Sequence, residues 1–318
     1  MSDILFSYEV IISFFISITV FMILLVAFIN TLYILKNYKQ DRTTQLQYKL
    51  EKLSYLITTI VYISLIIKII VLPYFTVTLE KLSTMISGAM CGAGVISANI
   101  YGEPLILLKL SLVILMMLWL TLNRYDLQSK GFIYFQLKMI FFLVIFFLLS
   151  IEIVLEYLFF TNLSTQNPVS CCSTLYNSTQ YNNQLPFNIS ILELVISFYT
   201  LYILIMFSSY VKQRYLVAFL SPVYAYVSYL SIVYFFSSYI YELPSHRCPY
   251  CLLQSDYYFI GYAIYFSMII ATYYALCSFF FVDRDKKVFY KSMFWYSIAT
   301  FFISFNFVYY ILINRTFL

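Results

Sequence analysis

The chain has 318 residues, of which 63% are hydrophobic and only 10% are charged. A soluble domain carries roughly 25% charged residues, so the composition excludes an ordinary soluble fold and predicts a protein of the lipid bilayer. The formal net charge of +5 is modest. Because no basic patch with interleaved aromatic residues lies outside the apolar runs, we expect no nucleic-acid partner.

Eight apolar runs follow one another along the chain, and each is close to the 20 or so residues that cross a bilayer. They lie at about 10–35, 53–78, 105–122, 139–161, 189–209, 216–240, 258–281 and 293–313. The links between them are too short for a soluble domain, and backbone in lipid must satisfy its own hydrogen bonds. We therefore expect an all-α, polytopic transmembrane helical bundle, with residues 1–318 forming a single domain.

Basic residues are distributed unevenly between the two sets of links. The links after the first, third, fifth and seventh runs hold 14 of the 19 Lys and Arg residues, whereas the opposite links and the C-terminus hold only Lys81, Arg247 and Arg315. Positively charged loops mark the cytoplasmic side. This pattern predicts that both termini face outward.

The link between the second and third runs is rich in glycine. Four of the six glycines lie between Gly88 and Gly102, around Cys91. Glycine allows a close approach of backbone segments or a positive φ. We expect a tightly packed loop that brings Cys91 towards the other cysteines.

Five ionisable residues interrupt the apolar runs: Lys68, Lys109, Glu152, Glu156 and Glu193. Charges at membrane depth are costly and mark functional sites by default. Glu152 and Glu156 are four residues apart and share one helix face. The functional interpretation is a polar cavity for protons, a cation or a quinone headgroup, and the structural one is a set of buried Lys–Glu pairs or side chains that reach the interface.

Most of the cysteines map to the predicted outer face. The five outward cysteines are Cys91, Cys171, Cys172, Cys248 and Cys251, and only Cys277 lies elsewhere, near the inner end of the seventh run. His246 and Arg247 directly precede Cys248. Such gathering of thiols on one face predicts a shared chemical or structural role.

Three chemistries fit these thiols. In the first, the Cys248–Cys251 pair performs thiol-disulfide exchange as a thiolate. In the second, the chain binds Zn²⁺ or Cu⁺, for which the candidate ligands are Cys91, Cys171, Cys172, His246, Cys248 and Cys251. In the third, the cysteines form structural disulfides in an oxidising compartment, although an odd number of outward cysteines leaves one without a partner.

The tetrapeptide Cys248-Pro249-Tyr250-Cys251 resembles a glutaredoxin active site. The resemblance covers these four residues alone, because nothing else in the sequence predicts the βαβ unit of glutaredoxins. The layout of a Cys-x-x-Cys pair with loop cysteines is also similar to that of quinone-linked disulfide-forming membrane enzymes of the DsbB and vitamin K epoxide reductase kind, which have four or five spans. That similarity implies a thiol relay with a quinone cofactor.

Longer strings around the cysteines resemble bacterial inner-membrane proteins of unassigned activity. They run from His246 through Leu253 and from Tyr257 to Tyr262, and include the glycine-rich stretch from Gly88 to Gly94. The resemblance implies an inner-membrane location with the cysteine loops facing the periplasm.

The first functional hypothesis is a membrane thiol-disulfide oxidoreductase or a protein that handles a thiophilic metal, with a periplasmic thiol protein or other membrane subunits as partners. In the redox form Cys248 or Cys251 is the nucleophile. The supporting residues are the relay thiols Cys91, Cys171 and Cys172 and the buried acid/base pair Glu152 and Glu156. The alternatives are a transporter that uses the buried Lys and Glu residues and an accessory subunit of a membrane complex.

Overall fold

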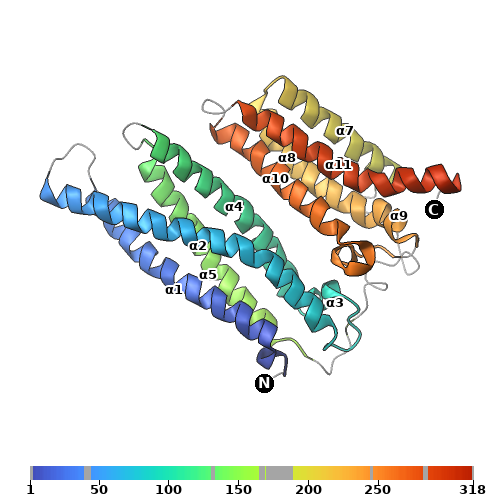
Figure 1. Ribbon diagram of the computed structural model, residues 1–318, viewed down its shortest axis with the longest axis horizontal. Coiled ribbons are helices and arrows are strands. Elements are labelled where there is room, and N and C mark those ends of the chain that lie inside the picture. The colour runs from blue at the N-terminus through green and yellow to red at the C-terminus, as the bar shows by residue number, and fades with distance from the viewer. Residues whose placement is uncertain are drawn as a thin grey trace. The chain divides into compact units, whose positions relative to one another are not determined.

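The computed structural model describes residues 3–38, 44–129, 133–164, 169, 189–243, 246–281 and 286–316 (Figure 1). Cys171 and Cys172, two of the predicted site residues, lie outside these residues. Within the described ranges the long helices are α1 (Tyr8–Asn37), α2 (Gln45–Ser83), α4 (Gly102–Gln128), α5 (Phe135–Thr161), α7 (Ile191–Tyr210), α8 (Arg214–Ser231), α10 (Ile260–Phe281) and α11 (Lys287–Asn314).

Short elements complete the described chain. They are the 3₁₀ helices η1 (Asp3–Phe6), η4 (Cys251–Leu253) and η5 (Ser255–Tyr257), the short α-helices α3 (Gly92–Ile96) and α9 (Ser237–Tyr241), and the π-helix η3 (Ile232–Phe236). The segments α8, η3 and α9 follow one another without a break and form one span, Arg214–Tyr241.

The described residues contain no strand, and eight of their helical spans are long and apolar enough to cross a membrane. The predicted all-α polytopic fold is therefore confirmed. The helices extend beyond several predicted runs: α2 begins at Gln45 and α11 at Lys287. These added turns are polar, and hydropathy alone does not include them in a span.

The chain forms two compact units, and each is described by itself. Unit 1 comprises Met1–Ser87 and Val95–Pro168, and unit 2 comprises Gly88–Gly94 and Val169–Leu318. The prediction of one domain over the whole chain stays a prediction.

Unit 1 is a ring of four helices. In it α1 packs on α2, α2 on α4, α4 on α5, and α5 on α1. Large side chains fill its interior, among them Trp119, Phe142 and Phe159, each no more than 1% exposed. Outward-facing Leu, Ile and Phe side chains cover the opposite helix faces, as expected of helices that contact lipid.

Unit 2 repeats this arrangement with α7, α8, α10 and α11. Here α7 packs on α8, α8 on α10, α10 on α11, and α11 on α7. The short segment Gly88–Gly94 comes from the link between α2 and α4 in the sequence, yet it belongs to unit 2. The bundle therefore gains a loop from the first half of the chain.

Hydroxyl groups join the helices inside unit 2. Tyr296 on α11 donates to Ser221 on α8 at 2.9 Å, and its hydroxyl lies 3.3 Å from that of Thr272 on α10. Tyr224 and Thr300 share a second bond, at 2.7 Å. Interhelical hydrogen bonds of this kind contribute on the order of 0.6 kcal/mol each in a membrane, so they specify which helices pack together more than they add stability.

Candidate functional site

Three cysteines that are distant in the sequence meet within unit 2. Cys91 directly precedes α3, Cys248 lies in the loop after α9, and Cys251 begins η4. Their three sulfur atoms all lie within 4.8 Å of one another. The Sγ atoms of Cys91 and Cys248 are 3.6 Å apart although 157 residues separate them in the chain. We call Cys91, Cys248 and Cys251 the three-sulfur cluster.

A glycine beside Cys91 permits this meeting. A Cβ added at Gly92 would lie 2.8 Å from the hydroxyl oxygen of Tyr250 and closer still to two carbons of its ring. Ordinary contact begins at about 3.4 Å. Because Tyr250 stands between Cys248 and Cys251 and is itself buried, the missing side chain at residue 92 lets the two cysteine segments pack together.

A second glycine fixes the other side of the cluster. A Cβ at Gly261, in the first turn of α10, would lie 2.8 Å from the carbonyl carbon of Leu252 and 2.9 Å from its oxygen. Leu252 is the residue after Cys251 and is fully buried. The start of α10 therefore presses directly on the backbone of η4 and holds Cys251 in place.

Two tyrosines bond to the backbone of the Cys248-Pro249-Tyr250-Cys251 turn. The hydroxyl of Tyr241, the last residue of α9, donates to the carbonyl of Cys248. The hydroxyl of Tyr265 on α10 donates to the carbonyl of Pro249 at 2.8 Å. These bonds satisfy buried carbonyls and leave the sulfur atoms facing one another.

The cluster is shielded from solvent. Cys91 and Cys248 are 0% exposed and Cys251 is 5% exposed. His246 packs edge-on against the ring of Tyr241, with centroids 4.4 Å apart. Its Nε2 atom is buried and has no hydrogen-bond partner within the part of the chain that the structure describes.

Burial also lowers the pKa of the two residues before Cys248. It lowers the pKa of His246 below the ordinary value of 6.5, and the neighbouring Cys91 opposes that shift only in part. It lowers the pKa of Arg247 as well. His246 is therefore neutral at pH 7, in the form that binds metals, but its nitrogens do not belong to the set of ligand atoms that lie within 4.8 Å of one another.

The remaining predicted site residues lie apart from this cluster. Cys171 and Cys172 fall outside the described residues. Cys277 is buried in α10 and is not a member of the cluster. Glu152 and Glu156 belong to unit 1, not to unit 2, so their proposed service as an acid/base pair for the thiols stays a prediction.

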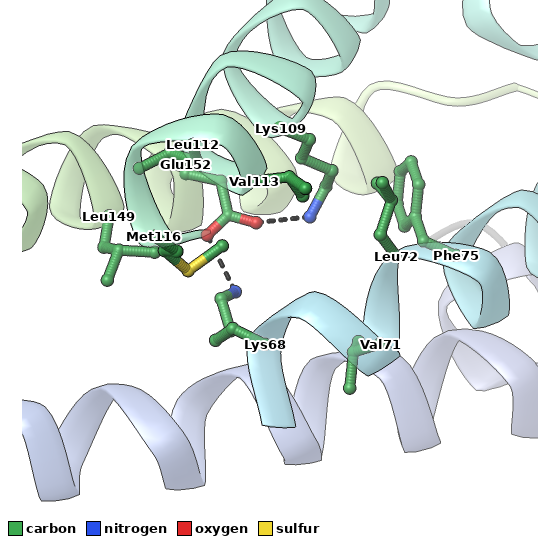
Figure 2. A pocket seen from close by; sticks show the side chains of 10 residues that line it. All are labelled: Lys68, Val71, Leu72, Phe75, Lys109, Leu112, Val113, Met116, Leu149 and Glu152. Carbon is green, nitrogen blue, oxygen red and sulfur yellow. Dashed lines mark hydrogen bonds and ion pairs between the residues drawn. The ribbon is translucent and has the colours of Figure 1, made fainter. Parts of the chain in front are cut away.

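Unit 1 contains a chain of alternating charges. The ammonium of Lys68 on α2 lies 2.8 Å from Glu152 on α5, and the ammonium of Lys109 on α4 bonds to the other oxygen of that carboxylate (Figure 2). Lys109 also lies 2.8 Å from Glu156, which accepts a hydrogen bond from Ser13 on α1 at 3.3 Å. The positive charges of the two lysines thus balance the negative charges of the two glutamates in the interior of unit 1.

A small cavity adjoins this charge chain. It has a volume of about 20 Å³ and is lined by Lys68, Lys109 and Glu152 together with apolar side chains that include Phe75 and Met116 (Figure 2). A water molecule needs roughly 10–15 Å³ by the same measure. The cavity therefore has room for about one water, and a quinone ring does not fit in it.

Two further charged residues, Lys138 and Glu193, have defined partners. Lys138, one of the basic residues counted in the link after the third predicted run, lies in the first turns of α5, 3% exposed, with its ammonium 2.7 Å from Asp126. Glu193, which interrupts the fifth predicted run, caps the start of α7 through Ser190, and its side chain is exposed.

No family model, curated protein or solved structure matches this chain. Its class is therefore defined by its own features. The chain is a membrane-spanning helical protein in which three cysteines lie close together.

Proposed function

We propose that this membrane protein binds a thiophilic metal ion through Cys91, Cys248 and Cys251. The observation that carries the proposal is the mutual approach of three buried sulfur atoms within 4.8 Å. Two thiolates bound to one zinc ion at about 2.3 Å with tetrahedral geometry lie roughly 3.8 Å apart. The 3.6 Å between the sulfurs of Cys91 and Cys248 is close to that separation.

Burial favours a metal over exchange with a partner thiol. Reactive cysteines in disulfide exchange are partly exposed, because a second sulfur must reach them in line. In the three-sulfur cluster the most exposed member is Cys251, at 5%. Enclosed thiolates around a metal are the usual arrangement of a structural or tightly held site.

Metal stoichiometry tests the proposal. The full-length protein, purified in detergent under reducing, oxygen-free conditions, is dialysed against Zn²⁺ or Cu⁺, and bound metal is counted per chain. We expect about one ion per chain, lost in Cys248→Ser. Cys277→Ser is the matched control, because Cys277 is also buried, at 1% exposed, but lies outside the cluster. Equal metal content in both variants contradicts the proposal.

Thiol-disulfide exchange is the second candidate, and the 3.6 Å contact between Cys91 and Cys248 favours it. In this reaction the two thiols reduce the disulfide of a partner protein, and their sulfurs join as the partner is released with two thiols. Acid-trapped alkylation of native membranes separates the candidates. A mixture of oxidised and reduced Cys248 supports exchange, whereas reduced thiols that resist alkylation support a bound metal.

Transport through unit 1 receives less support. Both glutamates of the charge chain are engaged by Lys109, and Glu152 is engaged by Lys68 as well. The adjoining cavity holds about one water. Closed ion pairs of this kind are commonly structural.

A further inference from the structure

The three-sulfur cluster also indicates which metal it binds. We propose that the ion is Cu⁺, held by Cys91, Cys248 and Cys251 alone. This inference rests on the proposed metal-binding function and narrows it to a soft monovalent ion. Its basis is the number, type and burial of the ligand atoms.

The number of ligands favours Cu⁺ over Zn²⁺. Zn²⁺ in proteins is almost always four-coordinate, whereas Cu⁺ is satisfied by two or three soft sulfur ligands. In the described part of the chain the group consists of three cysteine sulfurs, with no histidine, aspartate or glutamate as a fourth member. Among the described residues the set is therefore complete for Cu⁺ and one ligand short for Zn²⁺.

Burial makes it difficult for water to supply the missing ligand. Cys91, Cys248 and Leu252 are each 0% exposed, and Tyr250 is 9% exposed. Catalytic zinc sites, in which water is the fourth ligand, keep an open position. The Tyr250 ring fills the space that a side chain at residue 92 would occupy beside Cys91.

Charge opposes this choice but does not reverse it. Three thiolates around Cu⁺ carry a net charge of −2, against −1 around Zn²⁺, and burial of charge is costly. Four-coordination of Zn²⁺ would require a further side chain to move into the cluster, whereas three-coordinate Cu⁺ requires none, so coordination number decides.

His246 provides a direct test, since it is the only histidine in the chain. Zinc would recruit an imidazole to complete four-coordination, and His246 is the nearest candidate in sequence. A copper site of three sulfurs leaves that imidazole unligated. Nuclear magnetic resonance of protein labelled at histidine shows a single imidazole spin system, so ligation by Nδ1 or Nε2 is observed without overlap.

The experiment loads the full-length protein in detergent with Cu⁺ alone or with Zn²⁺ alone under oxygen-free conditions. We expect X-ray absorption of the copper-loaded protein to show a first shell of three sulfurs and no nitrogen. We also expect the His246 resonances to keep their unligated positions, and copper to be retained when zinc is added in equal amount.

The alternative results are distinct. A zinc-loaded protein with His246 ligated, from which copper does not displace the metal, overturns the copper assignment but leaves metal binding intact. Failure to bind either ion overturns both proposals.

Cys171→Ser/Cys172→Ser is the control variant: unchanged copper binding supports the three-sulfur assignment, and loss of copper overturns it. Cys91→Ser should lose the three-sulfur shell while the fold, followed by circular dichroism, stays intact.

Discussion

Gly92→Ala tests whether the close approach of two loops creates the three-sulfur cluster. The added Cβ would lie within 2.8 Å of the Tyr250 hydroxyl oxygen, and two ring carbons are closer. Tyr250 is only 9% exposed, so its ring has little room to turn away. Overpacking of this type costs about 1–3 kcal/mol. If the loops separate to relieve it, metal affinity falls about 5- to 150-fold.

The assay is competition for Cu⁺ between the protein and a chromophoric chelator of known affinity. A second substitution supplies the internal check. Tyr250→Leu removes the ring atoms that meet the new Cβ, so Gly92→Ala/Tyr250→Leu should bind metal better than the sum of the single effects predicts. We expect a coupling of about 1 kcal/mol or more, as found for residues in contact.

Gly94→Ala is the control within the same segment. Its added Cβ would lie 3.1 Å from the Cα of Ala89 and 3.2 Å from its Cβ, a tight but smaller overlap away from Tyr250. Its effect on metal affinity should therefore be weaker than that of Gly92→Ala. Unchanged affinity in Gly92→Ala, or strict additivity with Tyr250→Leu, would refute the idea that this contact positions the sulfurs.

Three further predictions concern pH and the charge chain. Metal affinity should rise with pH below the ordinary thiol pKa of about 8.5, by up to about tenfold per pH unit for each proton that binding releases. A metal affinity that does not change with pH would argue against thiolate ligands. Because burial lowers the pKa of His246, its imidazole resonances should titrate below pH 6.5. The free energy of unfolding should decrease as pH falls from 6.5 towards that lowered pKa, because the unfolded state binds the proton first. The His246→Gln variant should lack this pH-dependent decrease. Glu152→Gln should lower the free energy of unfolding by about 3–5 kcal/mol, because it leaves the buried Lys68 without its carboxylate partner. The charge-balanced double variant Lys68→Met/Glu152→Gln should lower the free energy of unfolding by less. Lys81→Gln is the exposed control, since the lysine side chain is 63% exposed and 3.8 Å from its carboxylate partner, and should change stability by less than about 1 kcal/mol.

The amino-acid sequence is sufficient to predict the class of the fold. A membrane span depends on the length and hydrophobicity of one continuous run, and its backbone bonds close within that run. Local information is therefore sufficient, and all eight predicted runs correspond to helices in the described chain. Only their polar ends were underestimated, as at Lys287, where α11 begins before its apolar stretch.

Which reactive groups meet depends on how distant segments pack in three dimensions. Cys91 and Cys248 are 157 residues apart, and no periodicity or spacing in the sequence measures such a distance. The glycine-rich link around Cys91 predicts close packing, but the ring that lies against Gly92 belongs to Tyr250 and is identified only in three dimensions.

The buried charges lead to the same conclusion. Hydropathy marked Lys68 and Glu152 as unusual within their spans, and buried pairing was one of two interpretations left open. The 2.8 Å contact between them depends on how α2 and α5 are placed in one bundle. Sequence thus specifies which helices form, because their hydrogen bonds are local, and packing specifies the sites, because their atoms come from distant parts of the chain.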